Sequence, residues 1–150
     1  MIEKLLGSSI PRRFALAEFL SKILLPLNKS LLKIDRLRKI EFCFLTQGFY
    51  FYFRPFVLTD LVLLFSDWEP YVKKIFLPQI GQIVFDIGAH IGFYTLLAAK
   101  KVGNSGLVVA FEPDQESFNL LKKNIQINGF TNVKSFDTAI GKKMAKVSFT

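Results

Sequence analysis

Residues 82–136 alternate between strand-like and helix-like patterns, and this order limits the possible folds more than any other feature of the chain. Short runs of apolar residues predict strands, and longer runs that end at glycines predict helices. Short connections between such elements indicate parallel strands joined by right-handed crossovers, as in a doubly wound α/β sheet. The expected elements are a strand over Gln82–Ile87, a helix over Ile91–Val102, a strand over Leu107–Phe111, a helix over Gln115–Asn128 and a strand over Val133–Phe136.

The sequence upstream of this sheet predicts helices and a hairpin. Apolar residues at helical spacing among basic ones indicate two short basic helices within residues 14–40, separated at Pro26. Two aromatic-rich runs, 39–45 and 49–54, flank a short polar turn with a glycine, which is typical of a β-hairpin. A short helix is expected over residues 72–77. We therefore expect a basic helical segment at 1–38, a hairpin with a lead-in helix at 39–78 and the α/β part at 79–150.

The positive charge of the chain is concentrated near its N-terminus. Twenty Lys and Arg residues against twelve Asp and Glu give a net charge of +8, and residues 1–40 hold nine of the basic side chains and three of the acidic ones. Basic amphipathic helices can bind anionic membrane surfaces or partner proteins. The same pattern also fits helices that pack on the core with a solvated charged side. The main alternative to an enzyme is therefore a non-catalytic binding module that docks a partner or a membrane surface through these helices.

Cysteine content and hydropathy limit the location of the protein and the kinds of site it can hold. The single cysteine, Cys43, excludes an intramolecular disulfide and a cysteine-rich zinc site, and we expect no metal. Every apolar run is broken by a charge or a proline before the roughly 18 residues that a membrane span needs, and no signal peptide is evident. We expect a cytoplasmic protein whose peripheral membrane contact, if any, is made by the basic helices.

The aromatic hairpin lacks the basic residues that accompany nucleic-acid stacking, so no nucleic-acid partner is expected.

The first strand of the α/β part continues into the following helix through a glycine-containing turn. Residues 84–92 have the sequence VFDIGAHIG, a D-x-G-x-x-x-G pattern in which Gly88 and Gly92 allow the backbone to approach a ligand closely. A dinucleotide-binding fingerprint has a glycine where this chain has Asp86. A carboxylate at that position would repel a pyrophosphate and attract a cationic amine, which favours S-adenosylmethionine as the ligand.

An acidic residue at the end of the second strand fits the same ligand. Glu112 lies 20 residues after Gly92, at the position from which a carboxylate can accept both hydroxyls of a ribose. Enzymes that use nicotinamide cofactors also place an acid there, so an NAD-dependent dehydrogenase is a weaker alternative that only the glycine turn opposes. In the simplest structural interpretation, the glycines merely allow close packing and Glu112 is a solvated loop residue.

Three motifs together resemble the FkbM-type S-adenosylmethionine-dependent methyltransferases. They are VFDIGAHIGFY at 84–94, FEPD at 111–114, and NGFTNV at 128–133 followed by AIG at 139–141. The resemblance covers about residues 60–150 and implies a Rossmann-like domain of which this chain carries the first three strands. It implies O-methylation of a hydroxyl group on a small molecule or a glycan, with S-adenosyl-L-methionine as cofactor.

The resemblance also implies roles for individual residues. His90 stands where the family often has asparagine, and we interpret it as structural or exposed rather than as a base. The residues expected at the cofactor are Asp86, Gly88 and Ala89 at the methionine end, with Gly92 completing the glycine turn, Glu112 at the ribose, and Asp137, Thr138 and Ala139 at the edge of the adenine.

The catalytic residues are not identified by these motifs. In the family, the strands that would carry the acceptor pocket and a general base come after the third strand, and this sequence stops at Thr150 before reaching them. We therefore expect the N-terminal half of a longer methyltransferase, whose acceptor and oligomeric state the sequence does not identify.

Overall fold

The computed structural model describes residues 39–57, 59, 60, 63 and 70–142 of the chain. These residues fall into two compact units, of which the larger contains 42–53 and 71–142. The basic helices expected within residues 14–40 lie outside the described residues, apart from the last two positions, and stay a prediction. The division into three segments also stays a prediction. Within the described ranges, no helix is long and apolar enough to cross a membrane.

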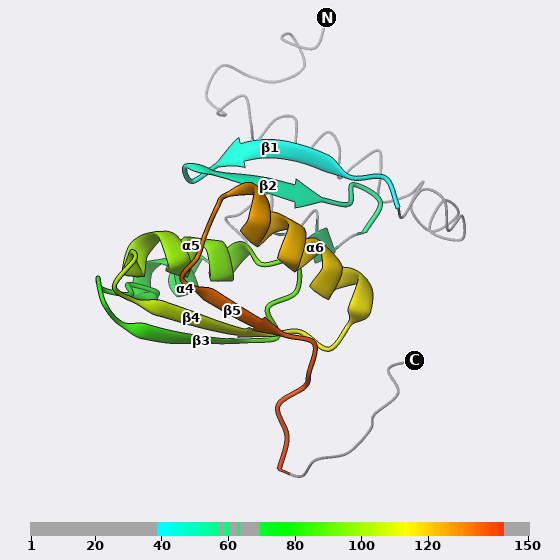
Figure 1. Ribbon diagram of the computed structural model, residues 1–150. Coiled ribbons are helices and arrows are strands. Elements are labelled where there is room, and N and C mark those ends of the chain that lie inside the picture. Colours follow the sequence, from blue (N-terminus) through cyan, green and yellow to red (C-terminus); the bar gives the residue numbers. More distant parts are fainter. Residues whose placement is uncertain (1–38, 58, 61–62, 64–69, 143–150) are drawn as a thin grey trace, which may run out of the picture. The chain divides into compact units, whose positions relative to one another are not determined.

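The larger unit is built around a parallel three-stranded sheet (Figure 1). Its strands are β3 (Ile83–Ile87), β4 (Leu107–Phe111) and β5 (Val133–Phe136), and they are hydrogen-bonded in the order β3-β4-β5. Helix α5 (Phe93–Val102) connects β3 to β4, and α6 (Gln115–Ile127) connects β4 to β5. This arrangement confirms the Rossmann-like α/β fold that the alternating sequence patterns predict.

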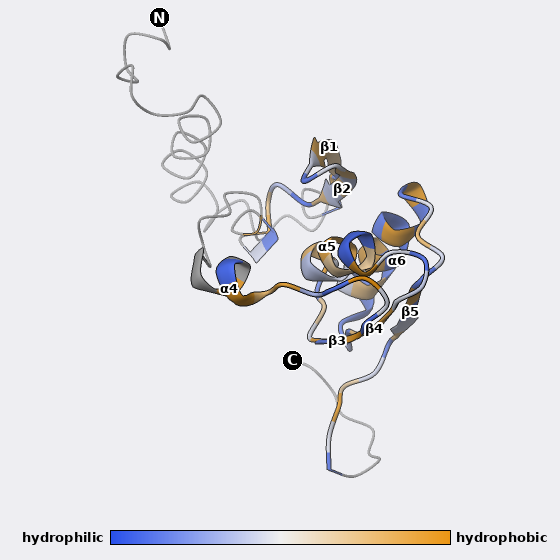
Figure 2. Ribbon diagram, turned by 90° about the vertical axis from the view of Figure 1, so that its left-hand side faces the viewer, coloured by the Kyte–Doolittle hydropathy of each residue, from blue (hydrophilic) through white to orange (hydrophobic). Residues whose placement is uncertain are grey.

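Both helices lie on the same face of the sheet (Figures 1 and 2), and alternate residues of each strand point toward them. Val108 of β4 packs in a cluster with the small residues Ala98 and Ala99 of α5. Ala110, two residues further along β4, packs against Leu121 of α6. All of these side chains are buried, so the core of the unit lies between the sheet and the helix pair.

A β-hairpin forms a third layer, on the side of the helices that faces away from the sheet (Figures 1 and 2). Its strands β1 (Phe42–Thr46) and β2 (Phe49–Phe53) are antiparallel, and the two residues between them have positive φ values of 47° and 75°, as a tight hairpin turn requires. The buried rings of Phe49 and Phe51 lie edge-on to Phe93 of α5, with centroid distances of 6.0 and 5.8 Å. The predicted hairpin is therefore confirmed, and it packs on the helices through its aromatic face.

The predicted element boundaries differ from the observed ones by at most three residues. The largest difference in the α/β part is at α5, which begins at Phe93 and not at Ile91, because Gly92 has a φ of 95° and lies outside the helical region. At α6 the N-cap is Asp114, whose carboxylate accepts a hydrogen bond from the Ser117 amide at 2.8 Å. Helix α4 (Pro70–Ile75) begins and ends two residues before the predicted helix.

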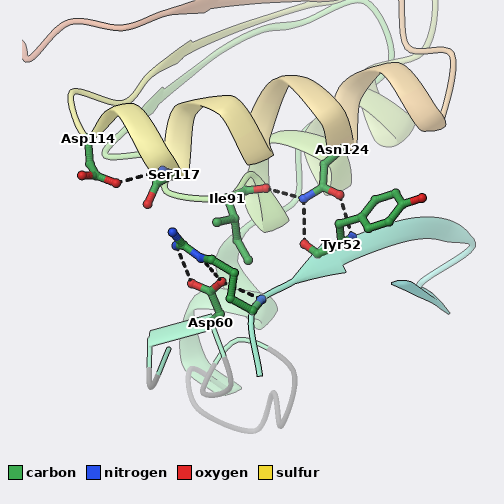
Figure 3. Close-up of polar contacts among 7 residues, drawn as sticks. Tyr52, Asp60, Ile91, Asp114, Ser117 and Asn124 are labelled. Carbon is green, nitrogen blue, oxygen red and sulfur yellow. Dashed lines mark hydrogen bonds and ion pairs between the residues drawn. The ribbon is translucent and has the colours of Figure 1, made fainter. Parts of the chain in front are cut away.

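In the smaller unit, Arg54 and Asp60 form a buried ion pair (Figure 3). The guanidinium donates from Nε to Oδ2 at 2.8 Å and from Nη2 to Oδ1 at 3.0 Å, and the Arg54 amide donates to Oδ2 at 2.9 Å. The hydrogen bonds of this bidentate pair and of the backbone amide replace those that water would make to the two buried charges. Arg54, the only basic residue of the run 49–54, therefore has a structural partner.

The face of the sheet opposite the helices is apolar and exposed. On β3, the side chains of Ile83, Phe85 and Ile87 are 63, 64 and 64% exposed, because the strand alternates and no described element covers this side. Phe136 of β5 adds to the same face and is 45% exposed. Contiguous apolar surface of this kind promotes association of protein chains.

We expect Phe85→Lys to increase the soluble fraction of the 150-residue chain, because it places a charge in the middle of the exposed apolar face. The measurement is soluble yield together with light scattering at several protein concentrations. Leu45→Lys is the control, since Leu45 is also 64% exposed but lies on the hairpin. Equal improvement by both variants would contradict a specific role of the sheet face.

Candidate functional site

The residues that the sequence singled out lie at one edge of the sheet. Gly88, Glu112 and Asp137 each follow directly after a strand, and the three strands are parallel and in register at their carboxyl ends. The Gly88 amide donates to the Phe111 carbonyl at 2.9 Å, and the Glu112 amide donates to the Phe136 carbonyl at 3.0 Å. The carboxyl edge of a parallel sheet is where α/β folds of this type bind ligands.

The two glycines of the turn have different physical roles. Gly88 has a φ of 80°, and a Cβ built on it would meet no atom within 4 Å. Gly92 has a φ of 95°, and a Cβ there would lie 2.4 Å from Cδ1 of Leu121 on α6. Gly92 is therefore required for packing of the turn against α6, as the structural interpretation of the sequence proposed. Only Gly88 leaves open space next to the backbone, as close approach of a ligand requires.

The backbone amides of the turn donate hydrogen bonds to acceptors within the protein. Gly88 and Ala89 both donate to the Phe111 carbonyl at 2.9 Å, and the His90 amide donates to Oε2 of Glu112 at 2.7 Å. His90 has a φ of 52°, which is uncommon for a residue with a side chain. These bonds hold the turn against the end of β4 and leave the amides at 88–90 committed to partners in the protein.

The Glu112 carboxylate is held in place by two backbone amides. Oε2 accepts from His90, and Oε1 accepts from the Asp114 amide at 2.8 Å. The residue is buried, with 7% of its surface exposed, and it is not the solvated loop residue of the structural interpretation. Since a carboxylate oxygen can accept more than one hydrogen bond, each oxygen keeps capacity for a further donor such as a hydroxyl group.

Asp86 is a second carboxylate of the same site, at the end of β3. Its side chain accepts a hydrogen bond from the hydroxyl of Thr95, a buried residue of α5. Burial raises the pKa of Asp86 above the ordinary value of 3.8; the bonds from the Thr95 hydroxyl and amide oppose the rise, and the negative charge of Glu112 adds to it. In the part of the chain that the structure describes, no Lys or Arg pairs with either carboxylate. This edge of the sheet therefore favours a ligand with positive charge.

The remaining predicted residues differ in how they could contact a ligand. Ala89 is buried in the core cluster with Ala110, so its side chain packs in the core. Asp137, Thr138 and Ala139 follow β5 at the same edge and are exposed. No group of three or more His, Cys, Asp and Glu residues within the described ranges could hold a metal ion.

Two asparagines have structural roles that the sequence analysis did not assign to them. Asn132 is buried, and its side-chain amide donates to the carbonyls of Ala99 and Gly103 at 2.9 and 2.8 Å, which satisfies the C-terminal end of α5. Asn124 is fully buried on α6 and donates to the Ile91 carbonyl of the glycine turn at 2.8 Å (Figure 3). The sequence does contain a signal for Asn124, because it is a polar residue at a position of the amphipathic pattern that faces the core.

Comparison with known proteins finds a methyltransferase family over the part of the chain that contains these residues. Residues 86–147 match the family described as the methyltransferase FkbM domain. Methyltransferase 1 of Beauveria bassiana is 27% identical over 110 residues, which are 71% of this chain and 43% of that protein. The uncharacterized protein MJ1452 of Methanocaldococcus jannaschii is 38% identical over 53 residues, 35% of this chain and 19% of that protein. The chain thus spans less than half the length of these curated relatives.

Solved structures share the fold. TYW2 of M. jannaschii, solved in complex with AdoMet, aligns over 63% of this chain and 42% of its own length, with a TM-score of 0.52 and 23% identity. PH0793 of Pyrococcus horikoshii aligns over 92% of this chain and 62% of its own length, with a TM-score of 0.54 and 14% identity. At these identities the likeness concerns the fold alone. The match to the family model confirms the FkbM-type methyltransferase resemblance of the sequence motifs over residues 86–147.

Proposed function

We propose that this chain carries the S-adenosylmethionine-binding part of a methyltransferase that transfers a methyl group to a hydroxyl of a small molecule or a glycan. The observation that carries the proposal is the pair of carboxylates, Asp86 and Glu112, beside the open backbone of Gly88. The match of residues 86–147 to the FkbM domain supports methyl transfer, and the resemblance of the motifs to that family supports a hydroxyl acceptor.

The residues at the sheet edge fit the chemical groups of this cofactor. Glu112 is positioned to accept hydrogen bonds from ribose hydroxyls, because its two oxygens are fixed by backbone amides. Asp86 supplies negative charge toward the cationic end of the cofactor, and Gly88 allows close approach. Residues 137–139 are available to the adenine at the end of β5. When bound, S-adenosylmethionine supplies the methyl group, and the protein contributes alignment of the acceptor and removal of its hydroxyl proton.

A dinucleotide cofactor fits this site less well. Phosphate binding at a glycine turn uses free backbone amides, but the amides of residues 88–90 already donate to Phe111 and Glu112. The two carboxylates would also repel a pyrophosphate. We therefore expect the chain to bind S-adenosylhomocysteine, the demethylated product, and not NAD. Calorimetric titration with both ligands tests this, and binding of NAD in place of S-adenosylhomocysteine would contradict the proposed function.

We expect Asp86→Asn to weaken S-adenosylhomocysteine binding by about tenfold, the equivalent of one charge-assisted hydrogen bond. The same variant should be more stable than the unsubstituted chain at pH 7. A raised pKa in the folded state means that ionised Asp86 opposes folding, and this effect grows as the pH rises from 3.8 through the folded-state value. The stability difference should therefore vanish well below pH 3.8, where the carboxyl group is protonated in both states.

Thermal melts from pH 3 to pH 8 and titrations at pH 7 measure both effects of the substitution. Glu116→Gln is the control, because it also removes one negative charge, at an exposed residue in the first turn of α6 that has no assigned role in binding. An Asp86→Asn variant that loses stability at pH 7, or that binds with unchanged affinity, would contradict the role given to Asp86.

A further inference from the structure

We propose that Asn124 is a positioning residue for the glycine turn and that it couples the β1–β2 hairpin to this turn. The inference rests on the proposed function in one respect, which is that residues 88–92 contact the cofactor. No motif of the family resemblance includes Asn124, and the residue lies on α6, outside the turn itself.

The side chain of Asn124 uses both of its polar atoms in a buried environment (Figure 3). Oδ1 accepts from the Tyr52 amide at 2.6 Å, and Nδ2 donates to the Tyr52 carbonyl at 3.0 Å. The second hydrogen of Nδ2 goes to the Ile91 carbonyl at 2.8 Å. One amide group therefore joins a strand of the hairpin, helix α6 and the glycine turn.

The contact with Ile91 lies next to a second contact between α6 and the turn. Leu121, one helical turn before Asn124, fills the space beside Gly92, where a Cβ would lie 2.4 Å from its Cδ1. Phe111 and Glu112 hold the other end of the turn by accepting the amides of residues 88–90. The turn is thus fixed at one end by β4 and at the other by α6, and Asn124 supplies the polar bond at the α6 end.

The hairpin completes the hydrogen bonding of this asparagine. In the observed register, Tyr50 and Tyr52 are opposite Leu45 and Cys43, at positions whose amides and carbonyls point away from β1. Their outward groups are bound by the side chains of Asn128 and Asn124, four residues apart on α6. The hairpin therefore orients the Asn124 amide so that its remaining hydrogen faces Ile91.

Asn128 provides a matched control because it makes the same kind of contact with the hairpin and none with the turn. Its Oδ1 accepts from the Tyr50 amide at 2.7 Å, and its Nδ2 donates to the carbonyls of Tyr50 and Asn124, both at 2.7 Å. Replacing either asparagine with aspartate removes an Nδ2 donor from two carbonyl groups. Only the replacement of Asn124 leaves the Ile91 carbonyl without its partner.

The experiment compares Asn124→Asp with Asn128→Asp. Hydrogen exchange of residues 88–96 is measured without ligand. Affinity is measured by titration with S-adenosylhomocysteine and with 5′-methylthioadenosine. We expect faster exchange at the Gly92 amide, which donates to the Ala89 carbonyl at 2.9 Å, in the Asn124 variant only. Affinity for S-adenosylhomocysteine should fall about tenfold in that variant, the equivalent of one lost hydrogen bond. 5′-Methylthioadenosine lacks the amino-acid end of the ligand, so its affinity should fall less.

Equal exchange at the turn in the two variants, or equal losses of affinity for the two ligands, would overturn the proposal. If Asn124→Asp does not fold, Asn124→Ala replaces it, because alanine adds no buried charge. If neither folds while Asn128→Asp does, Asn124 maintains the whole unit and is not specific to the turn, which also overturns the proposal. If the unsubstituted chain binds neither ligand, the proposed function fails, and the exchange comparison still decides whether Asn124 positions the turn.

Discussion

Gly92→Ala should lower the free energy of unfolding of the chain by about 2–5 kcal/mol, the sum of two separate costs. A residue with a side chain is strained by about 1–2 kcal/mol at the φ of 95° observed for Gly92. The new Cβ would also lie 2.4 Å from Cδ1 of Leu121, which is fully buried and cannot move without disturbing the core cluster. Overpacking of this kind costs about 1–3 kcal/mol.

Gly88→Ala is the matched comparison for this substitution. Gly88 also has a positive φ, 80°, but a Cβ there would meet no atom within 4 Å, so only the backbone strain of about 1–2 kcal/mol is expected. Its main effect should be on ligand affinity, because the methyl group would occupy the space beside the proposed cofactor. Urea denaturation measures the stability of both variants. A Gly88 variant as unstable as the Gly92 variant would show that both glycines serve packing alone.

The elements of the α/β part could be predicted because their signals are local in the sequence. An apolar run between Gly106 and Glu112 places β4 at its observed ends, and residues 133–136, with an apolar side chain at each end, place β5. The start of α5 was missed because Ile91 is apolar and fits the helical pattern, whereas the backbone at Gly92 is fixed by Leu121, which comes 29 residues later. A contact at that separation in sequence leaves no trace in a local pattern.

The position of the candidate residues at one edge of the sheet was predictable, and their contacts were not. Asp86, Gly88 and Glu112 were identified from spacing and charge, and all three lie at the carboxyl edge of the sheet. That the Ala89 side chain points into the core depends on how the turn packs beneath α6. The role of Asn124 depends on a hairpin strand that lies 72 residues away in sequence. Both features come from tertiary contacts that the motifs do not encode.

The internal hydrogen bonds of the turn give Glu112 two roles at once. It holds the amides of His90 and Asp114, and it offers its remaining acceptor capacity at the sheet edge. A binding residue that also fixes its own surroundings is preorganised, so that binding a ligand requires little further ordering. Substitutions at such a residue should therefore affect the turn and the ligand together.

Glu112→Gln should lower the affinity for S-adenosylhomocysteine by about 100-fold, the equivalent of two hydrogen bonds. Glutamine has the shape of glutamate, but its NH₂ group cannot accept a hydrogen bond. One of the two backbone amides that now bind Glu112, at 2.7 and 2.8 Å, would then face another donor, and one acceptor for the ribose would be lost. Calorimetric titration measures the affinity, and hydrogen exchange at the His90 and Asp114 amides reports the loss of their partner.

Asp114→Asn is the control for Glu112→Gln, because it removes the same charge two residues away. Asparagine caps a helix as well as aspartate does, so the bond from the Ser117 amide to this side chain should persist and α6 should remain intact. If the charge of this edge alone determined affinity, the two variants would lose binding equally. If Glu112 acts through its specific acceptors, Asp114→Asn should stay within about threefold of the unsubstituted chain, less than the equivalent of one hydrogen bond. A Glu112→Gln variant within that range as well would remove Glu112 from the cofactor site.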